Sequence, residues 1–304
     1  MKLRLGTRGS ALALWQARFV AERLAQVHPG TQVETVIIKT SGDRFQSISL
    51  DRIATRGVFV KEIEEALLAG DIDLAVHSLK DLPTDLPAGL ILAAFPERGD
   101  PSDALVSRGR ARLQELPEGA RVGTGSLRRL CQLKRRRPDL QVKDIRGNVD
   151  SRLAQVERGE IDAVVLATAG LQRLGRSDVI SEAFSPIGFL PAVGQGCLAV
   201  EVRGSDERTC QLVAALNHPA SQRAAQAERT LLAGLGGGCQ VPIGAYAFED
   251  QSTLRLKAFV SDADVCSWIE AESTGDDAVE LGRDVARRLL EQGAARVLQQ
   301  EIGR

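Results

Sequence analysis

The stretch LGGGCQVPIG, residues 235–244, places a single cysteine, Cys239, behind three consecutive glycines. A glycine-flanked thiol in a loop is accessible, and a thiolate is a strong nucleophile. A hydrolytic cysteine needs a histidine base, and the sequence nominates no histidine for that role. We therefore interpret Cys239 as a point of covalent attachment. The alternative is a tight glycine turn that carries an incidental cysteine.

The octapeptide HSLKDLPT, residues 77–84, follows the apolar run IDLAV. Lys80 and Asp81 are expected at the carboxyl end of a buried strand, where Pro83 stops further regular structure. A carboxylate beside a lysine at the edge of a cleft can hold a cationic or N–H-bearing substrate and pass protons. An ordinary exposed ion pair of little energetic value is an equally open interpretation.

Positive charge is concentrated in residues 121–158, which hold eleven lysines and arginines against four acids in a chain of net charge −1. The run KRRRP, residues 134–138, falls late in an expected helix, where cations suit the helix dipole, and we interpret it mainly as solvated surface. Other arginines fall at element ends, where α/β proteins bind ligands and where guanidinium groups suit carboxylates or phosphates. These are Arg128, Arg129, Arg146 and Arg152.

Two similar turns lead from an expected strand into an expected helix, LGTRGS at residues 5–10 and VGTGS at residues 122–126. The first N–H groups of a helix lack internal partners and favour an anion. Each turn is therefore a candidate anion site, and the alternative is simple N-capping by Ser10 and Ser126. The arginines beside both turns favour the anion sites.

The hydrophobic pattern predicts the scaffold for these residues. Strand-like runs KLRLG, VETVIIKT, IDLAVHS and LILAAF alternate with helical periodicity at 10–28 and 59–70, which is typical of βαβ units and a largely parallel sheet. The order then recurs, since GDIDLAVHS at 70–78 is echoed by GEIDAVVLA at 159–167. We predict an α/β fold with two similar domains.

Two crossings are expected between these domains, one at Pro101 and one in residues 189–203, where the glycines of PAVGQG form a hinge. They would enclose a cleft suited to a ligand. The chain then changes to a helix at 220–235, three strand-like runs and a closing helix at 276–299, which indicates a smaller α+β domain. The predicted domains are residues 1–98 with 197–216, residues 99–196, and residues 217–304.

Composition argues against several classes of protein. The 304 residues are 43% hydrophobic, which supplies a core, and the balanced charge gives no general attraction to nucleic acid or membrane. Five single cysteines without C-x-x-C spacing and three histidines predict neither disulfides nor a metal centre. RNA binding would need interleaved aromatics, which are only 4% of the chain. Without an export signal or an apolar span of about 18 residues, we expect a cytoplasmic protein.

The chain resembles the porphobilinogen deaminase family, also called hydroxymethylbilane synthase. The resemblance covers essentially the whole length and implies two periplasmic-binding-protein-like (type II) lobes with mostly parallel sheets plus a smaller C-terminal α+β domain. Family members join four porphobilinogen molecules head to tail with loss of ammonia and free a linear tetrapyrrole by hydrolysis. Eight motifs occur in the family's order and spacing: LGTRGSALALWQA, GVFVKEIEEALL, DLAVHSLKDLPT, VGTGSLRRLCQL, DIRGNVDSRL, ATAGLQRLG, PAVGQGCLAVE and GGGCQVPIGA.

The resemblance also implies a dipyrromethane cofactor, joined through a thioether to Cys239, and a monomer. It implies that Asp81 and Lys80 are the catalytic residues, with Asp81 as the acid–base carboxylate. The growing chain accumulates acetate and propionate groups, which the arginines would bind. The implied cofactor-binding residues are Cys239, Lys80, Asp81, Thr124, Ser126, Arg128, Arg129 and Arg146. The implied substrate-binding residues are Arg8, Ser10, Arg146, Arg152, Arg173 and Gln195.

One segment departs from the family's pattern. Residues 54–57 read ATRG where many members carry Gly-Gly-Lys-Gly, so Arg56 replaces a lysine and the mobility expected of a lid is left open. Two competing hypotheses are a two-lobed, non-enzymatic anion-binding protein and the effector domain of a regulator. The missing export signal argues against the first, and the missing helix-turn-helix argues against the second.

Overall fold

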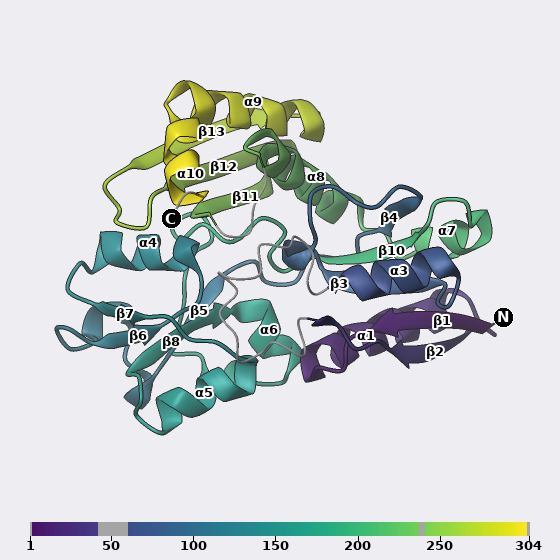
Figure 1. Ribbon diagram of the computed structural model, residues 1–304, viewed down its shortest axis with the longest axis horizontal. Coiled ribbons are helices and arrows are strands. Elements are labelled where there is room, and N and C mark those ends of the chain that lie inside the picture. The colour runs from purple at the N-terminus through teal and green to yellow at the C-terminus, as the bar shows by residue number, and fades with distance from the viewer. Residues whose placement is uncertain (1, 42–59, 237–240, 303–304) are drawn as a thin grey trace. The chain divides into compact units, whose positions relative to one another are not determined.

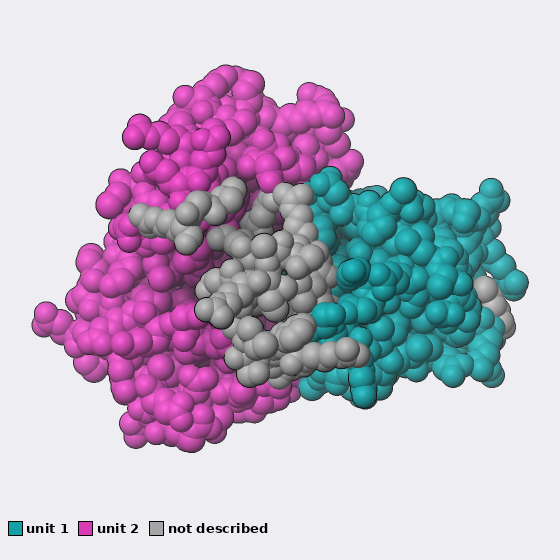
Figure 2. Space-filling model, in the orientation of Figure 1, with its two compact units in different colours: residues 1–99, 197–222 teal, residues 100–196, 223–304 magenta. Residues whose placement is uncertain are grey.

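The computed structural model describes residues 2–41, 60–236 and 241–302 (Figure 1). The chain divides into two compact units, residues 1–99 with 197–222 and residues 100–196 with 223–304 (Figure 2). We call them unit 1 and unit 2. No helix in the described ranges is long and apolar enough to cross a membrane.

Unit 1 is built on a five-stranded sheet in the order β2-β1-β3-β10-β4. β1 pairs in parallel with β2 and β3, whereas β10 runs antiparallel to both β3 and β4. Four strands therefore share one direction, which confirms the predicted mostly parallel sheet. The strands are β1 (Lys2–Thr7), β2 (Gln32–Ile37), β3 (Leu74–Ser78), β4 (Leu90–Ala94) and β10 (Leu198–Arg203).

Different helices cover the two faces of this sheet. On β3, Leu74 and Val76 join the core that also holds residues of α1 (Ala11–Val27), whereas Ala75 joins the core under α3 (Lys61–Ala69). This alternation follows from the two-residue period of a strand. A third helix, α7 (Glu207–Ala214), packs against β4 and β10.

Unit 2 contains a second five-stranded sheet in the order β7-β6-β8-β5-β9. β6 pairs in parallel with β7 and β8, and β5 runs antiparallel to β8 and β9. The strands are β5 (Asp103–Ser107), β6 (Arg121–Gly123), β7 (Gln141–Lys143), β8 (Ala163–Ala167) and β9 (Glu182–Ala183). The helices are α4 (Leu127–Arg136), α5 (Val149–Glu157) and α6 (Thr168–Arg173), with 3-10 turns at Arg108–Arg110, Leu113–Glu115 and Ser177–Val179.

The two sheets match strand for strand. In each, the single antiparallel strand lies fourth in the order and is the first strand after the chain has changed units, β5 in unit 2 and β10 in unit 1. The predicted repeat of two similar α/β lobes is therefore confirmed, and it fits the type II fold that the resemblance implies.

Unit 2 also holds a three-stranded antiparallel sheet of β11 (Ile243–Asp250), β12 (Thr253–Ser261) and β13 (Trp268–Gly275). α8 (Pro219–Gly234) precedes this sheet, and the predicted C-terminal α+β part is confirmed. The separation of residues 217–304 from residues 99–196 as a domain of its own stays a prediction.

The prediction of a single closing helix over residues 276–299 is wrong in one respect. The structure has two helices, α9 (Ala278–Glu291) and α10 (Ala294–Ile302). Gly293 separates them with a φ of 98°, in the left-handed region that a continuing right-handed helix does not use.

Candidate active site

The turn that carries Asp81 is held by its apolar neighbours. β3 ends at Ser78, and a 3-10 turn, Leu79–Asp81, follows directly. Leu79 and Leu82 are each 2% exposed, and the N–H of Leu79 donates to the carbonyl of Cys197 at 3.1 Å. The burial of these two leucines leaves Lys80 half-buried and Asp81 exposed. Both polar side chains thus follow the carboxyl end of a buried strand, as the sequence predicts.

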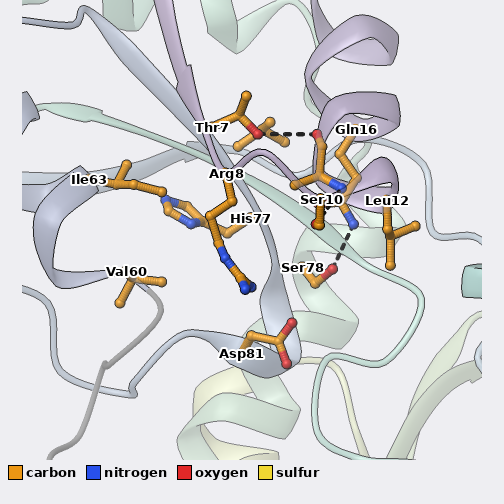
Figure 3. Close-up of a pocket in the computed structure, with 12 residues that line it drawn as sticks. Thr7, Arg8, Ser10, Leu12, Gln16, Val60, Ile63, His77, Ser78 and Asp81 are labelled. Carbon is orange, nitrogen blue, oxygen red and sulfur yellow. Dashed lines mark hydrogen bonds between the residues drawn. The ribbon is translucent and has the colours of Figure 1, made fainter. Parts of the chain in front are cut away.

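A pocket in unit 1 brings Asp81 together with residues from the first turn of the chain (Figure 3). Arg8 and Ser10 line it from the segment after β1, and Arg8 reaches toward Asp81 (Figure 3). Gln16 of α1 donates from Nε2 to the Ser78 hydroxyl at 2.7 Å, which ties the helix to the end of β3. The structure therefore gathers three of the predicted site residues. We call this cavity the unit 1 pocket.

The two glycine-rich turns differ in how their serines are used. The Ser10 hydroxyl accepts a hydrogen bond from the N–H of Ala13 at 3.3 Å, so Ser10 caps α1. Ser126 precedes α4, but its side chain makes no cap bond, and its own N–H donates to the Thr124 hydroxyl at 3.2 Å. The capping interpretation is thus confirmed for Ser10 and wrong for Ser126.

Arg128 and Arg129 in unit 2 share a buried carboxylate that the sequence analysis did not single out. Asp103 is 0% exposed and stands at the start of β5. Arg128 donates from Nη1 to Asp103 Oδ2 at 2.7 Å, and Arg129 donates from Nη2 to Oδ1, also at 2.7 Å. The predicted Gln195 joins them, because its Nε2 donates to Oδ1 at 3.0 Å. No spacing rule links these positions, which come together only through the sheet.

Electrostatics in this cluster leave an excess of positive charge. The two guanidinium groups hold the pKa of Asp103 well below its usual range, against the opposing effect of burial. Burial lowers the pKa of Arg128, and its Nε has no hydrogen-bond partner among the described residues. One buried carboxylate therefore faces two buried cations. An anionic ligand would complete the balance.

Two further predicted arginines extend this positive region. Burial, then the charges of Arg129 and Arg146, lower the pKa of Arg152 to about 10. Such mutual repulsion requires the three cations to lie near one another. Arg146 is exposed and pairs with exposed Asp144 at 3.1 Å. The binding of carboxylates by this group stays a prediction.

The other predicted basic residues have separate partners. Arg173, in the last turn of α6, donates from Nη2 to the Gly196 carbonyl at 2.6 Å.

Within the run KRRRP, Arg135 and Arg136 are exposed, as predicted, and lie over the rings of Trp268 and Phe189. Arg137 differs, because it donates to the carbonyls of residues 113, 116 and 117 and fastens the end of α4.

Two sequence predictions fall on residues outside the described ranges. These are Cys239 and the segment 54–57 with Arg56. The described chain on either side of the cysteine is α8, which ends at Gly234, and β11, which begins at Ile243. The roles assigned to the individual site residues remain predictions.

Comparison with known proteins adds an independent finding. Residues 3–211 match the family model described as "Porphobilinogen deaminase, dipyromethane cofactor binding domain", and residues 222–291 match "Porphobilinogen deaminase, C-terminal domain". A porphobilinogen deaminase of Thermus thermophilus is 51% identical over 97% of this chain and 98% of its own length. One from Syntrophomonas wolfei is 47% identical over 97% of both chains.

Solved structures of other proteins show a weaker similarity. The substrate-binding domain of a putative molybdenum ABC transporter from Clostridium difficile has a TM-score of 0.45 and 12% identity, over 73% of this chain and 94% of its own. The periplasmic VFT2 domain of Bordetella pertussis BvgS has a TM-score of 0.40 and 17% identity, over 70% and 85%.

Proposed function

The chain belongs to the porphobilinogen deaminase family, and from that premise we propose that Asp81 is the acid–base carboxylate of its reaction. The protein is a transferase of tetrapyrrole biosynthesis. It joins four porphobilinogen molecules head to tail, releases ammonia at each addition, and frees hydroxymethylbilane by hydrolysis. Its cofactor is dipyrromethane.

The observation that carries the role of Asp81 is its place in the unit 1 pocket. Arg8 reaches toward its exposed carboxylate, and Ser10 lines the same cavity (Figure 3). A carboxylate in this position accepts hydrogen bonds from the pyrrole N–H and from the aminomethyl group of porphobilinogen. It also stabilises the cation that develops as the amine departs, because the opposite charge is already in place. Lys80, on the same turn, would assist Asp81 at the catalytic centre and bind a carboxylate of the cofactor.

The described residues of unit 2 fit the implied cofactor. A dipyrromethane carries several carboxylates, and the arginine cluster holds excess positive charge together with an unpartnered buried donor on Arg128. When bound, the group supplies the pyrrole end to which substrate is joined. Cys239 would hold it by a thioether. Its carboxylates would be bound by Lys80, Thr124, Ser126, Arg128, Arg129 and Arg146.

Substrate carboxylates would be bound by a second set of side chains. Arg152 is suited to this role because it is half-buried and close to other cations, so an incoming carboxylate relieves the repulsion. Arg146 is accessible from solvent and can serve both ligands. The proposed substrate-binding set is Arg8, Ser10, Arg146, Arg152, Arg173 and Gln195.

A cytoplasmic monomer that binds no nucleic acid is part of the same proposal. The absence of nucleic-acid binding is supported by the net charge of −1 and by the low aromatic content of 4%, which gives few stacking platforms for bases. Sedimentation at micromolar concentration tests whether the protein is a monomer. An RNA-binding titration at low salt tests whether it binds nucleic acid.

Asp81→Asn tests the central role, because the amide keeps the shape and removes the charge. We expect a fall in kcat of about 10²-fold or more, measured as ammonia released from porphobilinogen. The matched control is Asp71→Asn, which changes another exposed carboxylate of unit 1. Normal ammonia release by Asp81→Asn would remove Asp81 from the acid–base role.

A further inference from the structure

Three buried titratable side chains meet beside the unit 1 pocket: His77 of β3, Glu201 of β10 and Glu64 of α3. In the antiparallel register, His77 lies opposite Ala199, and Glu201 lies opposite Ala75. His77 and Glu201 are therefore diagonal neighbours on one face of the sheet. Ala75 joins the core under α3, so this is the face that α3 covers. The proposed function gives these three groups no role.

Glu201 fixes the ring of His77. His77 Nε2 lies 2.9 Å from Glu201 Oε2, and the two residues are 5% and 0% exposed. An ionised carboxylate can only accept, so Nε2–H donates to it. The same imidazole lines the unit 1 pocket (Figure 3). A ring with a carboxylate partner and a pocket in reach can accept a proton, because the carboxylate stabilises the imidazolium.

Further charged groups surround the ring. Burial raises the pKa of Glu64, and the negative charge of Glu201 raises it further. One oxygen of each of these carboxylates has no hydrogen-bond partner in the part of the chain that is described. Among the described residues, Arg8 and Asp81 are the other charged groups that line the same pocket. Two ionised carboxylates and one neutral imidazole carry a net charge of −2. The buried cluster becomes neutral only when it binds two further protons.

We propose that His77, backed by Glu201, is a second acid–base group of the pocket and takes up the proton that each coupling releases. This inference rests on the proposed function. In a coupling, a C–C bond forms between the methylene carbon of porphobilinogen and the free α-carbon of the attacked pyrrole. The C–N bond to the protonated aminomethyl group breaks with its electron pair on nitrogen, and ammonia leaves. The α C–H bond breaks, its pair returns to the ring, and the proton passes to the imidazole and then to ammonia, giving ammonium.

Glu201→Gln in the full-length protein with its cofactor tests the proposal. The amide still accepts from Nε2–H but no longer stabilises an imidazolium. We expect kcat to fall about 10²-fold while the KM for porphobilinogen changes less than about threefold. The rising limb of the pH–rate profile should move to lower pH, because the ring loses its counter-charge. A purely structural role would lower the melting temperature and leave the profile in place.

Glu64→Gln is the matched control, since Glu64 is buried in the same cluster but forms no hydrogen bond with His77. The charge of Glu64 interacts with the ring only through space, so we expect kcat to fall much less than in Glu201→Gln and the pH profile to shift less. An equal loss of kcat in both variants would overturn the specific role of Glu201. A wild-type rate and profile in Glu201→Gln would overturn the whole inference.

A readout on the wild-type protein does not depend on activity or on the folding of a variant. The chain has only three histidines, so ¹⁵N NMR of the imidazole groups can be assigned with His77→Gln. We expect the neutral ring of His77 to be the tautomer protonated at Nε2, and the opposite tautomer would contradict the inference. Absence of ammonia release by the wild type would instead contradict the proposed function, which keeps the two failures distinct.

Discussion

Arg129 donates two hydrogen bonds to the same oxygen of Asp103, from Nε at 2.9 Å and from Nη2 at 2.7 Å. Both side chains are buried, and Arg129 makes a third bond from Nη1 to the Val165 carbonyl at 3.0 Å. A guanidinium held by three bonds has little freedom to reorient. Asp103 therefore fixes the position of an arginine that is predicted to bind the cofactor.

Asp103→Asn should destabilise the protein strongly. The substitution leaves two buried guanidinium groups without a counter-charge, and loss of one partner of a buried pair costs about 3–5 kcal/mol. The measurement is the free energy of unfolding in urea. The control is Asp139→Asn, which removes the exposed partner of Arg137 and should leave the urea midpoint close to wild type. Equal midpoints for the two variants would show that the Asp103 pair is not stabilising.

The same carboxylate predicts a pH dependence of stability. Its pKa is lowered in the folded state, so it stabilises the fold above its unfolded pKa of about 3.9 and loses that effect as pH falls toward the folded value. The difference in unfolding free energy between wild type and Asp103→Asn should therefore be full at pH 6 and shrink below about pH 4. If the difference in unfolding free energy stays constant across this pH range, the pKa of Asp103 is not lowered in the folded state.

The two cap serines form a matched pair for mutation. Ser10→Ala removes an acceptor for the N–H of Ala13 and should cost about 1 kcal/mol of stability. Ser126→Ala removes no cap bond, so the melting temperature should stay near wild type. The proposed role of Ser126 in binding cofactor predicts a defect in cofactor loading. The two readouts are the melting temperature and the fraction of protein that carries cofactor. A lower melting temperature for Ser126→Ala than for Ser10→Ala would contradict the assignment of Ser10 as the cap.

Arg152→Gln should impair function without a loss of stability. Burial and the neighbouring cations lower its pKa, so the folded protein gains little from this charge. The substitution removes one exposed hydrogen bond, from Arg152 Nε to the Gly147 carbonyl at 2.9 Å, so the melting temperature should stay close to wild type. The loss of a charge-assisted hydrogen bond should raise the KM for porphobilinogen about 10-fold or more. Arg158→Gln, on an exposed residue paired with Glu160, is the control. A fall in melting temperature with unchanged KM would assign Arg152 to structure.

Much of the fold was predictable because it follows from local patterns. The alternation of apolar strands and periodic helices gave the two repeated lobes, and Lys80 with Asp81 lies at the strand end where Pro83 indicated a stop. The break between α9 and α10 was missed because the apolar pattern continues across Gly293, whose left-handed φ the pattern does not record.

The partners of the site residues were not predictable. Asp103 is 25 residues from Arg128 in sequence, and Glu201 is 124 residues from His77. Both pairs form between neighbouring elements of a sheet or its covering helices, so only the three-dimensional pairing brings them together. Buried charges with no local signature are found by searching the structure for counter-ions.

The measurement that tests the account most directly is the intact mass of the purified protein and of Cys239→Ser. We predict that the wild type is heavier than its polypeptide by one dipyrromethane and gains further single-pyrrole increments with porphobilinogen. Cys239→Ser should carry neither addition. A wild type with the bare polypeptide mass that gains nothing with porphobilinogen, or a dipyrrole still attached in Cys239→Ser, would contradict the account.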